Sequence, residues 1–454
     1  MDSFFYISSR LAKVKCTEKE ELDIKTFVEA LQNDEPKQLA FFEYARKWKL
    51  APWFYIQLSR KALLSFFTTK IQSEFETFYQ KIKLQNENRN KEALNFLRKF
   101  EEHAVDVVIL KGNLLIHNTY NDVGYKKMND FDMLIRPKDW KTVQEIYNEL
   151  AYIPLGFGWA GEKQEPAKFS HAGMSFISPN YHCITGTQWG LKSPTSSYRM
   201  DLEKAWAATS DFDFYGVKTK QLTPEYNILH LILHMGIYKI GIRDCMDIFN
   251  IFLSQPVDED KLVEIITQAN ACDKAYFTLS LTQLCSDAVP ATLLERLKPK
   301  RQAFIVKRLA SRLEMARQTG DMQLSYNDYF HEIEHNVFYF SLFPHFHKKA
   351  YFYWRILSYI FFAKHTLALK LADCNADCSL AQRVKAQLKA PVFGFALIGE
   401  EIGLSITFVL LFKLFFDMLF SIKNYFYKQE SYFDYLEKRN IKAHEIVAAV
   451  KGIE

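Results

Sequence analysis

The sequence predicts an α+β protein in which a small sheet domain lies between two helical regions. Apolar residues recur at three- and four-residue spacing before residue 103 and the pattern is again helical after residue 223. Between these regions, short runs rich in β-branched residues end at turns, as strands do. The 454 residues, 48% of them hydrophobic, are enough for a sizeable core. We expect a helical N-terminal region at 1–103, an α/β domain at 104–222 and a helical C-terminal domain at 223–454.

Three helices are expected in the N-terminal region. The segments EKEELDIKTFVEALQ and QLAFFEYARKWKL carry apolar residues at helical spacing. A third and longer helix is expected at roughly 70–103, with a charged face in QKIKLQNENRNKEALNFLRKFEEH. None of the three segments contains an interior proline, which would break a helix.

The period of the pattern changes at residue 105. The run VDVVIL reads as a strand that ends at Lys111-Gly112, and NLLIHNTY is expected to begin a helix at this turn. A second strand, DFDMLI, is stopped by Arg136-Pro137, and an amphipathic helix follows in KDWKTVQEIYNELAY. Two further strands are expected within 168–191, joined at a Ser-Pro-Asn turn. A short linker follows, and from Thr223-Pro224-Glu225 the pattern is helical to the end.

Two aspartates on the second strand are the clearest chemical signal. Asp130 and Asp132 alternate along the strand, so both carboxylates face one side, about 7 Å apart along the chain. Two anions held this close repel each other, and a divalent cation relieves the repulsion. The pair therefore predicts a site for Mg²⁺ or Mn²⁺, although Asp is also common at solvated strand ends.

The turn between the first strand and its helix predicts a phosphate site. Gly112 would let the backbone approach a phosphate, and the first amides of the following helix, including that of Asn113, favour anions. Lys111 would add a positive charge. The alternative is an ordinary strand-to-helix turn that happens to contain a glycine.

Taken together, these residues resemble a family of uncharacterised bacterial nucleotidyltransferases with the DNA polymerase β-like fold. The pattern of that family is a strand ending in Leu-Lys-Gly, an acidic D-x-D pair, a strand ending in Asp-x-His-Trp, a Leu- and His-rich helix and an Arg-x-x-x-Asp stretch. The resemblance extends over about 40–250, and its matches here are Leu110-Lys111-Gly112, Asp130 to Ile135, Trp189, Pro224 to His234, and Arg243 with Asp247.

The resemblance implies a polymerase β-like sheet domain that moves NMP from an NTP to an acceptor. It assigns Asp130 and Asp132 to catalysis and Mg²⁺ binding, and Lys111, Gly112, Asn113 and Lys126 to the nucleotide. The acceptor could be a small molecule, a sugar or a protein, and no specific nucleic-acid partner is predicted. The resemblance also implies a bacterial source.

Two departures from the pattern bear on activity. Lys126 stands where the family has an arginine, and Gly186 stands where a third carboxylate is expected. A third carboxylate would bind metal and help to activate the acceptor hydroxyl, and glycine does neither. Asp201 and Glu203 are the nearby acids that would substitute for it, although a helix-capping role fits them better. Whether the chain is an enzyme therefore stays open, and the alternative is a catalytically degenerate nucleotide-binding or protein-interaction module.

Other charged and metal-binding side chains have competing interpretations. Lys126, Lys127 and Arg136 would either neutralise phosphate oxygens or be solvated loop charges. His230 and His234 have the i, i+4 spacing of zinc ligands, but a packed, hydrogen-bonded pair fits their apolar helix better. Cys374 and Cys378 lack a second pair, so free thiols in a loop are expected.

The overall composition indicates a cytoplasmic protein. Seven scattered cysteines fit a reducing compartment, and a net charge of +5 is too small for a general nucleic-acid coat. The apolar segment 395–420 is interrupted by charges, so a buried or interfacial helix is favoured over a membrane span. The aromatic-rich C-terminal region leaves open a peripheral contact with a membrane surface.

Overall fold

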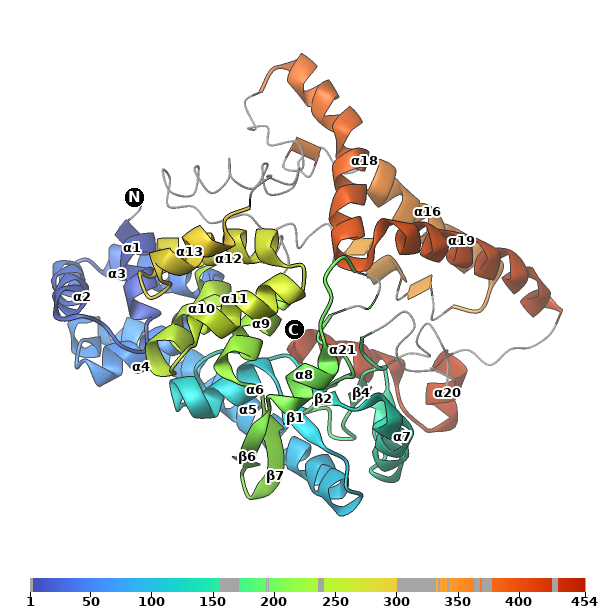
Figure 1. Cartoon of the computed structure of the whole chain (residues 1–454), viewed down its shortest axis with the longest axis horizontal. Coiled ribbons are helices and arrows are strands. Elements are labelled where there is room, and N and C mark those ends of the chain that lie inside the picture. Colours follow the sequence, from blue (N-terminus) through green and yellow to red (C-terminus); the bar gives the residue numbers. More distant parts are fainter. Residues whose placement is uncertain are drawn as a thin grey trace.

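A five-stranded mixed sheet lies among helices in the computed structural model (Figure 1). The strand order is β5-β2-β1-β7-β6. The expected fold class, a small sheet domain with helical flanks on both sides, is confirmed. The structure describes residues 3–155, 171–192, 194, 196–235, 241–299, 332–333, 335–337, 339–340, 343–362, 368–369, 378–426 and 432–453.

The two strands predicted around the acidic pair form the centre of the sheet. β1 (Val107–Ile109) and β2 (Phe131–Ile135) are antiparallel and fully buried. β5 (Thr185–Gln188) runs parallel to β2, with Asp132 paired to Gly186. This register brings the acidic strand and the segment of the missing third carboxylate side by side.

The other edge of the sheet is a hairpin that the sequence analysis missed. β6 (Ser210–Phe214) and β7 (Val217–Gln221) are antiparallel, and β7 runs parallel to β1. Their turn is Tyr215-Gly216, with φ values of 50° and 85°. Two successive left-handed residues are typical of a two-residue hairpin turn. Residues 201–221 are therefore a short helix, α8 (Leu202–Ala207), and a hairpin rather than a linker.

Helices at the N-terminus pack against helices that follow the sheet. One hydrophobic core contains residues of both sets, including Phe41, Trp53, Ile232 and Phe249. The elements before the sheet are α1 (Ser3–Leu11), α2 (Glu18–Leu31), α3 (Glu35–Lys47), α4 (Ala51–Arg60), η1 (Leu64–Phe66) and α5 (Thr69–Glu102). Those after it are α9 (Pro224–Met235), α10 (Ile242–Ser254), α11 (Glu259–Gln268), α12 (Cys272–Cys285) and α13 (Ala291–Leu297).

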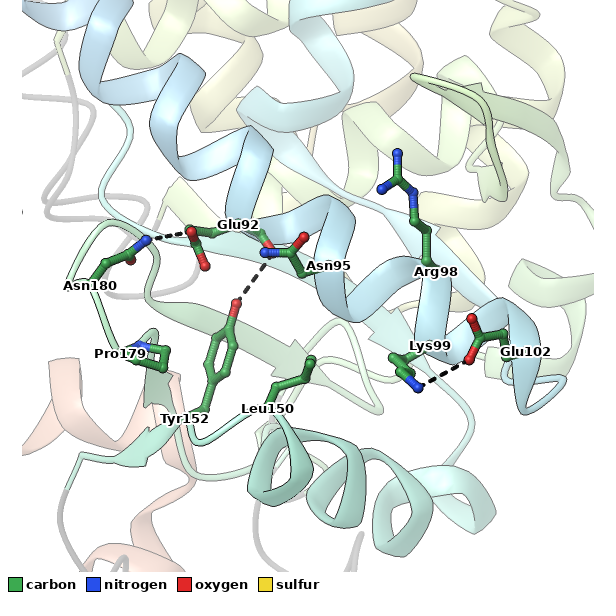
Figure 2. A pocket seen from close by; sticks show the side chains of 9 residues that line it. All are labelled: Glu92, Asn95, Arg98, Lys99, Glu102, Leu150, Tyr152, Pro179 and Asn180. Carbon is green, nitrogen blue, oxygen red and sulfur yellow. Dashed lines mark hydrogen bonds and ion pairs between the residues drawn. The ribbon is translucent and has the colours of Figure 1, made fainter. Parts of the chain in front are cut away.

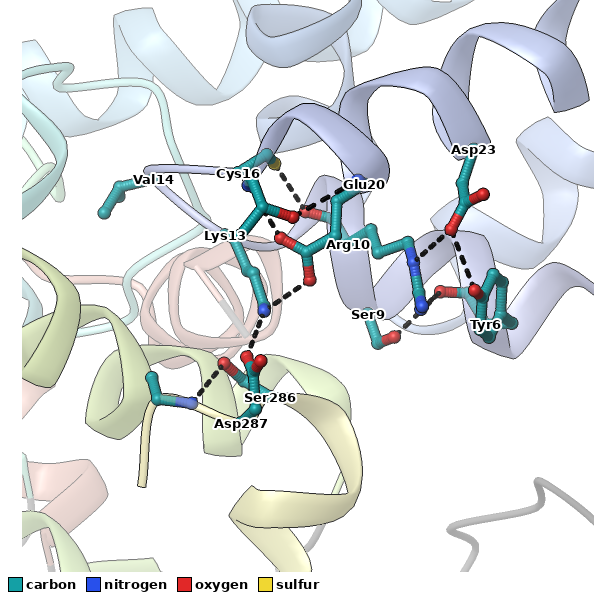
Figure 3. Close-up of polar contacts among 12 residues, drawn as sticks. Tyr6, Ser9, Arg10, Lys13, Val14, Cys16, Glu20, Asp23, Ser286 and Asp287 are labelled. Carbon is teal, nitrogen blue, oxygen red and sulfur yellow. Dashed lines mark hydrogen bonds and ion pairs between the residues drawn. The ribbon is translucent and has the colours of Figure 1, made fainter. Parts of the chain in front are cut away.

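Polar contacts at the end of α1 join these two sets of helices (Figure 3). The ammonium of Lys13 lies 2.6 Å from Glu20 and 2.8 Å from Asp287, a residue 274 positions away in the chain. Asn250 of α10 accepts a hydrogen bond from the amide of Val14. These contacts fix the N-terminal helices to the same body that positions the sheet.

The long helix α5 connects the front core to the sheet. Its first half buries Ile71 and Phe75 in the helical core, and its second half buries Phe96 and Phe100 against the sheet. α7 (Trp140–Glu149) covers the same part of the sheet through Val143, Tyr147 and other residues of that second core. The helix predicted to follow Arg136-Pro137 is thus present, after a short 3-10 turn, η3 (Pro137–Asp139).

The C-terminal part contains α16 (Phe346–Phe361), α18 (Leu380–Ile402), α19 (Leu404–Phe420), η5 (Ser421–Tyr425), α20 (Tyr432–Lys438) and α21 (Ala443–Ile453). The last two helices return to a second small sheet made of β3 (Ile153–Pro154) and β4 (Phe176–Ile177). There Tyr432 donates a hydrogen bond to the carbonyl of Pro154, 2.7 Å away. The expected boundaries at 103 and 222 stay a prediction.

The apolar segment 395–420 is two helices rather than one. α18 ends at Ile402, and α19 begins at Leu404, because Gly403 between them has a φ of 86°. None of the described helices is long and apolar enough to cross a membrane.

Candidate functional site

The site begins where β1 ends. Lys111, the first residue of α6 (Lys111–Leu115), has a φ of 51°, a left-handed conformation that is uncommon for a residue with a side chain. Its ammonium lies 2.9 Å from Oδ1 of Asp132 on the adjacent strand. The turn and the acidic strand, 21 residues apart in sequence, are therefore in direct contact.

Asp132 is buried and accepts two hydrogen bonds at the same oxygen. Nζ of Lys111 and Nε2 of Gln188 both lie 2.9 Å from Oδ1, and 8% of the aspartate side chain is exposed. The lysine thus places a positive charge in direct contact with the buried carboxylate. Gln188 lies two residues after Gly186 on β5 and was not predicted as a site residue.

Asp130 lies immediately before β2 and is partly exposed. Burial raises the pKa of Asp130 to about 6, and the charge of Asp132 adds to this rise, while Lys111 and Arg89 oppose it. The pair is thus arranged as two interacting acids, one of which gives up its proton close to neutral pH.

The glycine of the turn is required by close packing. A Cβ atom at Gly112 would lie 2.7 Å from Sδ of Met128 and 3.2 Å from the hydroxyl of Tyr125. Beside it, Nδ2 of Asn113 lies 3.4 Å from the backbone oxygen of Asp130. The turn therefore packs directly on the segment that carries the first aspartate.

The long helix α5 holds that segment from one side. Asn86 donates hydrogen bonds to the carbonyls of Val123 and Lys126, and Arg89 donates one to the carbonyl of Met128. Both polar side chains are buried, although they belong to a polar stretch of α5. Asn86 and Arg89 are three residues apart in the polar run NENRN, which places both on one side of the helix. This spacing was the signal in the sequence that the two side chains act together.

The helix α10 holds the same segment through the Arg-x-x-x-Asp stretch. Arg243 donates a hydrogen bond to the carbonyl of Lys127, 3.0 Å away, and Asp247 forms an ion pair with Lys126. Asp247 also accepts a hydrogen bond from Tyr120 at 2.8 Å. The family motif thus has a structural role in this chain, because it fixes the backbone that leads into Asp130.

The charged residues around the pair are engaged with other side chains. Lys126 is not a solvated loop charge, since 12% of its side chain is exposed and it pairs with Asp247. Arg136 lies 3.3 Å from Glu203 and stacks over the ring of Trp206. A direct phosphate contact by Lys126 stays a prediction, and it requires the pair with Asp247 to open.

The position of the missing third carboxylate lies directly against the acidic pair. A Cβ atom at Gly186 would be 2.8 Å from Oδ1 of Asp132. The two acids considered as replacements have other roles, because Asp201 caps α8 through the amide of Lys204 and Glu203 pairs with Arg136. Position 186 thus lies directly against Asp132, and a side chain there would collide with that carboxylate in the present arrangement.

The arrangement of these strands and turns agrees with a comparison to known protein families. The family described as "Uncharacterised nucleotidyltransferase" matches residues 34–287, which is more than half of the chain. This chain belongs to that nucleotidyltransferase family. Neither a curated protein nor a solved structure matches it.

The acidic pair would supply two protein ligands for a metal ion, fewer than a site built from protein side chains alone would need. Among the described residues, no group of three or more His, Cys, Asp or Glu side chains could hold a metal ion. Mg²⁺ is commonly bound by one or two carboxylates, with phosphate oxygens and waters completing its shell. The two carboxylates of Asp130 and Asp132 match such a set of protein ligands in kind and number, and they do not form a complete protein cage.

The histidines of α9 are not a hydrogen-bonded pair. The ring centroids of His230 and His234 are 6.3 Å apart, His230 is buried and His234 is exposed. Within the described residues, Nδ1 of His230 has no hydrogen-bond partner. Burial lowers the pKa of His230, and the charges of Lys111, His171 and Lys192 lower it further. A neutral imidazole thus lies near the predicted phosphate turn. Cys378 is a free thiol, and Cys374 lies outside the described residues.

The cleft drawn in Figure 2 is separate from these residues. It has a volume of about 460 Å³, and none of the predicted site residues lines it. Its wall comes from α5, the end of α7 and the turn at Asn180, and Lys99 in this wall pairs with Glu102. The wall contains two acids and two bases, so its charge does not favour an anionic nucleotide.

Proposed function

We propose that this member of the nucleotidyltransferase family moves NMP from an NTP to an acceptor in a Mg²⁺-dependent reaction. The observation that supports the proposal most is the contact of Lys111 with Asp132, next to Asp130, at the strand ends. One turn and one strand thereby supply a cation for phosphate and two carboxylates for a metal. The acceptor is a hydroxyl on a small molecule, a sugar or a protein.

Each residue at the site has a distinct part in this proposal. Asp130 and Asp132 would hold Mg²⁺ (or Mn²⁺), and the ion would neutralise the triphosphate and stabilise the leaving pyrophosphate. The backbone amides of Gly112 and Asn113 would bind phosphate oxygens. Lys111, which is the partner of Asp132 in this structure, would exchange that contact for one with phosphate when the metal binds.

The transfer itself would exchange one phosphorus–oxygen bond for another. The acceptor oxygen attacks the α-phosphorus, the bond to the β-phosphate oxygen breaks, and pyrophosphate leaves with that electron pair. Gly186 cannot take the proton of the acceptor hydroxyl. Because Asp130 and Asp132 would be engaged with the metal, the proton would therefore pass to water.

A second function is favoured by Gly186. A catalytic metal normally bound by three acids would be held more weakly by two, so the chain would then bind a nucleotide without transferring it. In that case the chain is a nucleotide-binding or protein-interaction module. The clamps from α5 and α10, which fix the segment before Asp130, are compatible with both functions.

One experiment separates the two functions. The purified full chain is mixed with each of the four NTPs labelled at the α-phosphate, with Mg²⁺, and with a cell extract as a source of acceptors. Transfer of the label, absent with Asp130→Asn and Asp132→Asn, supports the enzyme. Mg²⁺-dependent binding without transfer or pyrophosphate release supports a nucleotide-binding module, and the absence of both binding and release overturns both the enzyme and the nucleotide-binding module. Protease treatment of the labelled product distinguishes a protein acceptor from a small one.

A further inference from the structure

The helix α19 is mostly apolar on the side that faces away from the protein, where Lys413 and Asp417 are also exposed. Leu414 and Met418 are buried against the neighbouring helices, as is expected of an inward face. A helix at a protein surface normally carries charged residues on its opposite side. Here that side exposes large apolar side chains, with exposed fractions between 36% and 65%: Leu404, Phe408, Val409, Phe412, Phe415, Phe416, Leu419 and Phe420.

The first half of α18 has a narrower apolar stripe with lysines beside it. The stripe repeats every four residues and is 53–78% exposed. Lys385 and Lys389, each one residue after a member of the stripe, are exposed as well. A row of apolar residues with adjacent lysines is typical of helices that lie at a membrane surface. The stripe consists of Leu380, Val384, Leu388 and Val392.

The helix α16 packs against both of these helices and extends the surface. It exposes Trp354 (65%) and Tyr351 (53%), and Phe362 directly after it is 69% exposed. Figure 1 shows α16, α18 and α19 together in one orange-to-red lobe, apart from the five-stranded sheet. Many exposed apolar side chains on helices that contact one another mark a contact surface on a protein. We call the exposed residues of these three helices the apolar face.

The charges of the same segment point to an anionic partner. α16, α18, α19 and η5 together contain eight lysines and arginines and three acidic residues. Aromatic side chains beside basic ones fit the boundary between lipid headgroups and acyl chains. α19 has 17 residues, and α18 is broken from it at Gly403, so these helices suit a position in the plane of the membrane.

We propose that the apolar face binds the surface of an anionic lipid bilayer, with the phenylalanines of α19 at the acyl boundary and the lysines of α18 at the headgroups. This function is independent of the nucleotide site. It would hold the transferase domain next to a membrane and thereby bring membrane-bound acceptors within reach.

Co-sedimentation of the full chain with vesicles tests the proposal. The protein is expected to sediment with vesicles of phosphatidylcholine and phosphatidylserine, and more weakly with phosphatidylcholine alone or at high salt. Phe412→Glu and Leu388→Glu are expected to abolish sedimentation. Leu84→Glu is the matched control, because Leu84 is 56% exposed on α5, outside the apolar face, and this variant should sediment normally. Equal loss in the control and the two variants would overturn the proposal.

Two further measurements separate lipid from protein partners. Replacing Lys385 and Lys389 together by Gln should weaken vesicle binding on the order of tenfold. Vesicles should shift the tryptophan emission to shorter wavelength, and Trp354→Phe should remove most of that shift. The proposal would be contradicted if the chain does not bind anionic vesicles but forms a dimer that Phe412→Glu dissociates. That result would show that a second copy of the chain covers the apolar face.

Discussion

Gly186 lies directly against Asp132, so close that a Cβ atom at position 186 would be 2.8 Å from the carboxylate oxygen that Lys111 and Gln188 share. The position of the absent third acid and the present position of Asp132 thus exclude each other. In this chain a lysine ammonium contacts Asp132. The positive charge in contact with Asp132 before any metal binds is therefore that of Lys111.

We expect Gly186→Ala to destabilise the protein by about 1–3 kcal/mol, because the new methyl group collides with Asp132. Gly186→Asp should cost more in the absence of metal, since it adds a third negative charge at the site. With Mg²⁺ or Mn²⁺ the Gly186→Asp variant should regain stability, because the metal offsets the added negative charge. Its metal-induced rise in Tm should then be larger than that of the wild type. Thermal unfolding with and without metal checks this, and equal metal effects in both proteins would contradict it.

Asp130→Asn should stabilise the metal-free protein while removing its metal site. The pKa of Asp130 is raised to about 6, so the folded state holds this proton more tightly than the unfolded chain does. The stability that comes from this proton is complete below about pH 4 and is lost as the pH rises through about 6. The free energy of unfolding of the variant should therefore exceed that of the wild type above pH 6, by on the order of 2 kcal/mol. Below pH 4 the two proteins should be equally stable.

The measurement for Asp130 is chemical denaturation at several pH values in the presence of a chelator. Asp106→Asn is the control, because Asp106 is an exposed aspartate just before β1 and lies outside the site. A variant that is less stable than the wild type at neutral pH would contradict the electrostatic account.

Arg89→Met should weaken the clamp on the segment before Asp130. It removes hydrogen bonds to the carbonyl of Met128 and to Asn86 and takes away a positive charge that lowers the pKa of Asp130. We expect a loss of about 2–4 kcal/mol in stability and a pKa of Asp130 above that of the wild type. Arg98→Met, at an exposed position of the same helix, should leave both unchanged. NMR titration of the Asp130 carboxyl and denaturant unfolding report the two effects.

Lys126 and Asp247 should be energetically coupled. Each single change, Lys126→Met or Asp247→Asn, leaves the other group buried without its charge partner and should cost about 3 kcal/mol. The double variant should lose less than the sum of the two. If Lys126 acts through the segment it anchors, both single variants will weaken NTP binding alike. A loss confined to Lys126→Met would instead assign it a direct phosphate contact.

The sequence predicted the parts of the fold that depend on local patterns. The two central strands, the turn at Lys111-Gly112 and the helix after Pro137 follow from short apolar runs and their stop signals. The hairpin of β6 and β7 was missed because its outer strand, SDFDF, alternates two aspartates with aromatic residues at an exposed edge. The alternation of polar and aromatic residues and the Tyr215-Gly216 turn were present in the sequence. Most residues of β6 are exposed, however, so the strand lacks the apolar run by which the buried strands were predicted.

The supports of the site were harder to predict because their partners are distant in sequence. Asn86 and Arg89 bind carbonyls 37 to 40 residues away, and periodicity alone does not distinguish a buried polar residue from a solvated one. Gln188 was missed for the same reason, since its contact with Asp132 depends on the register of β2 and β5.

The central claim, that Asp130 and Asp132 hold a divalent ion together with a nucleotide, is tested most directly by electron paramagnetic resonance of Mn²⁺. The signal of free Mn²⁺ is followed as the full chain is added in the presence of an NTP, for the wild type, Asp130→Asn and Asp106→Asn. We predict that the wild type and Asp106→Asn remove one Mn²⁺ per chain from solution and that Asp130→Asn removes none beyond the metal bound by the NTP itself. Equal Mn²⁺ uptake by all three proteins, or uptake by none, would contradict the claim.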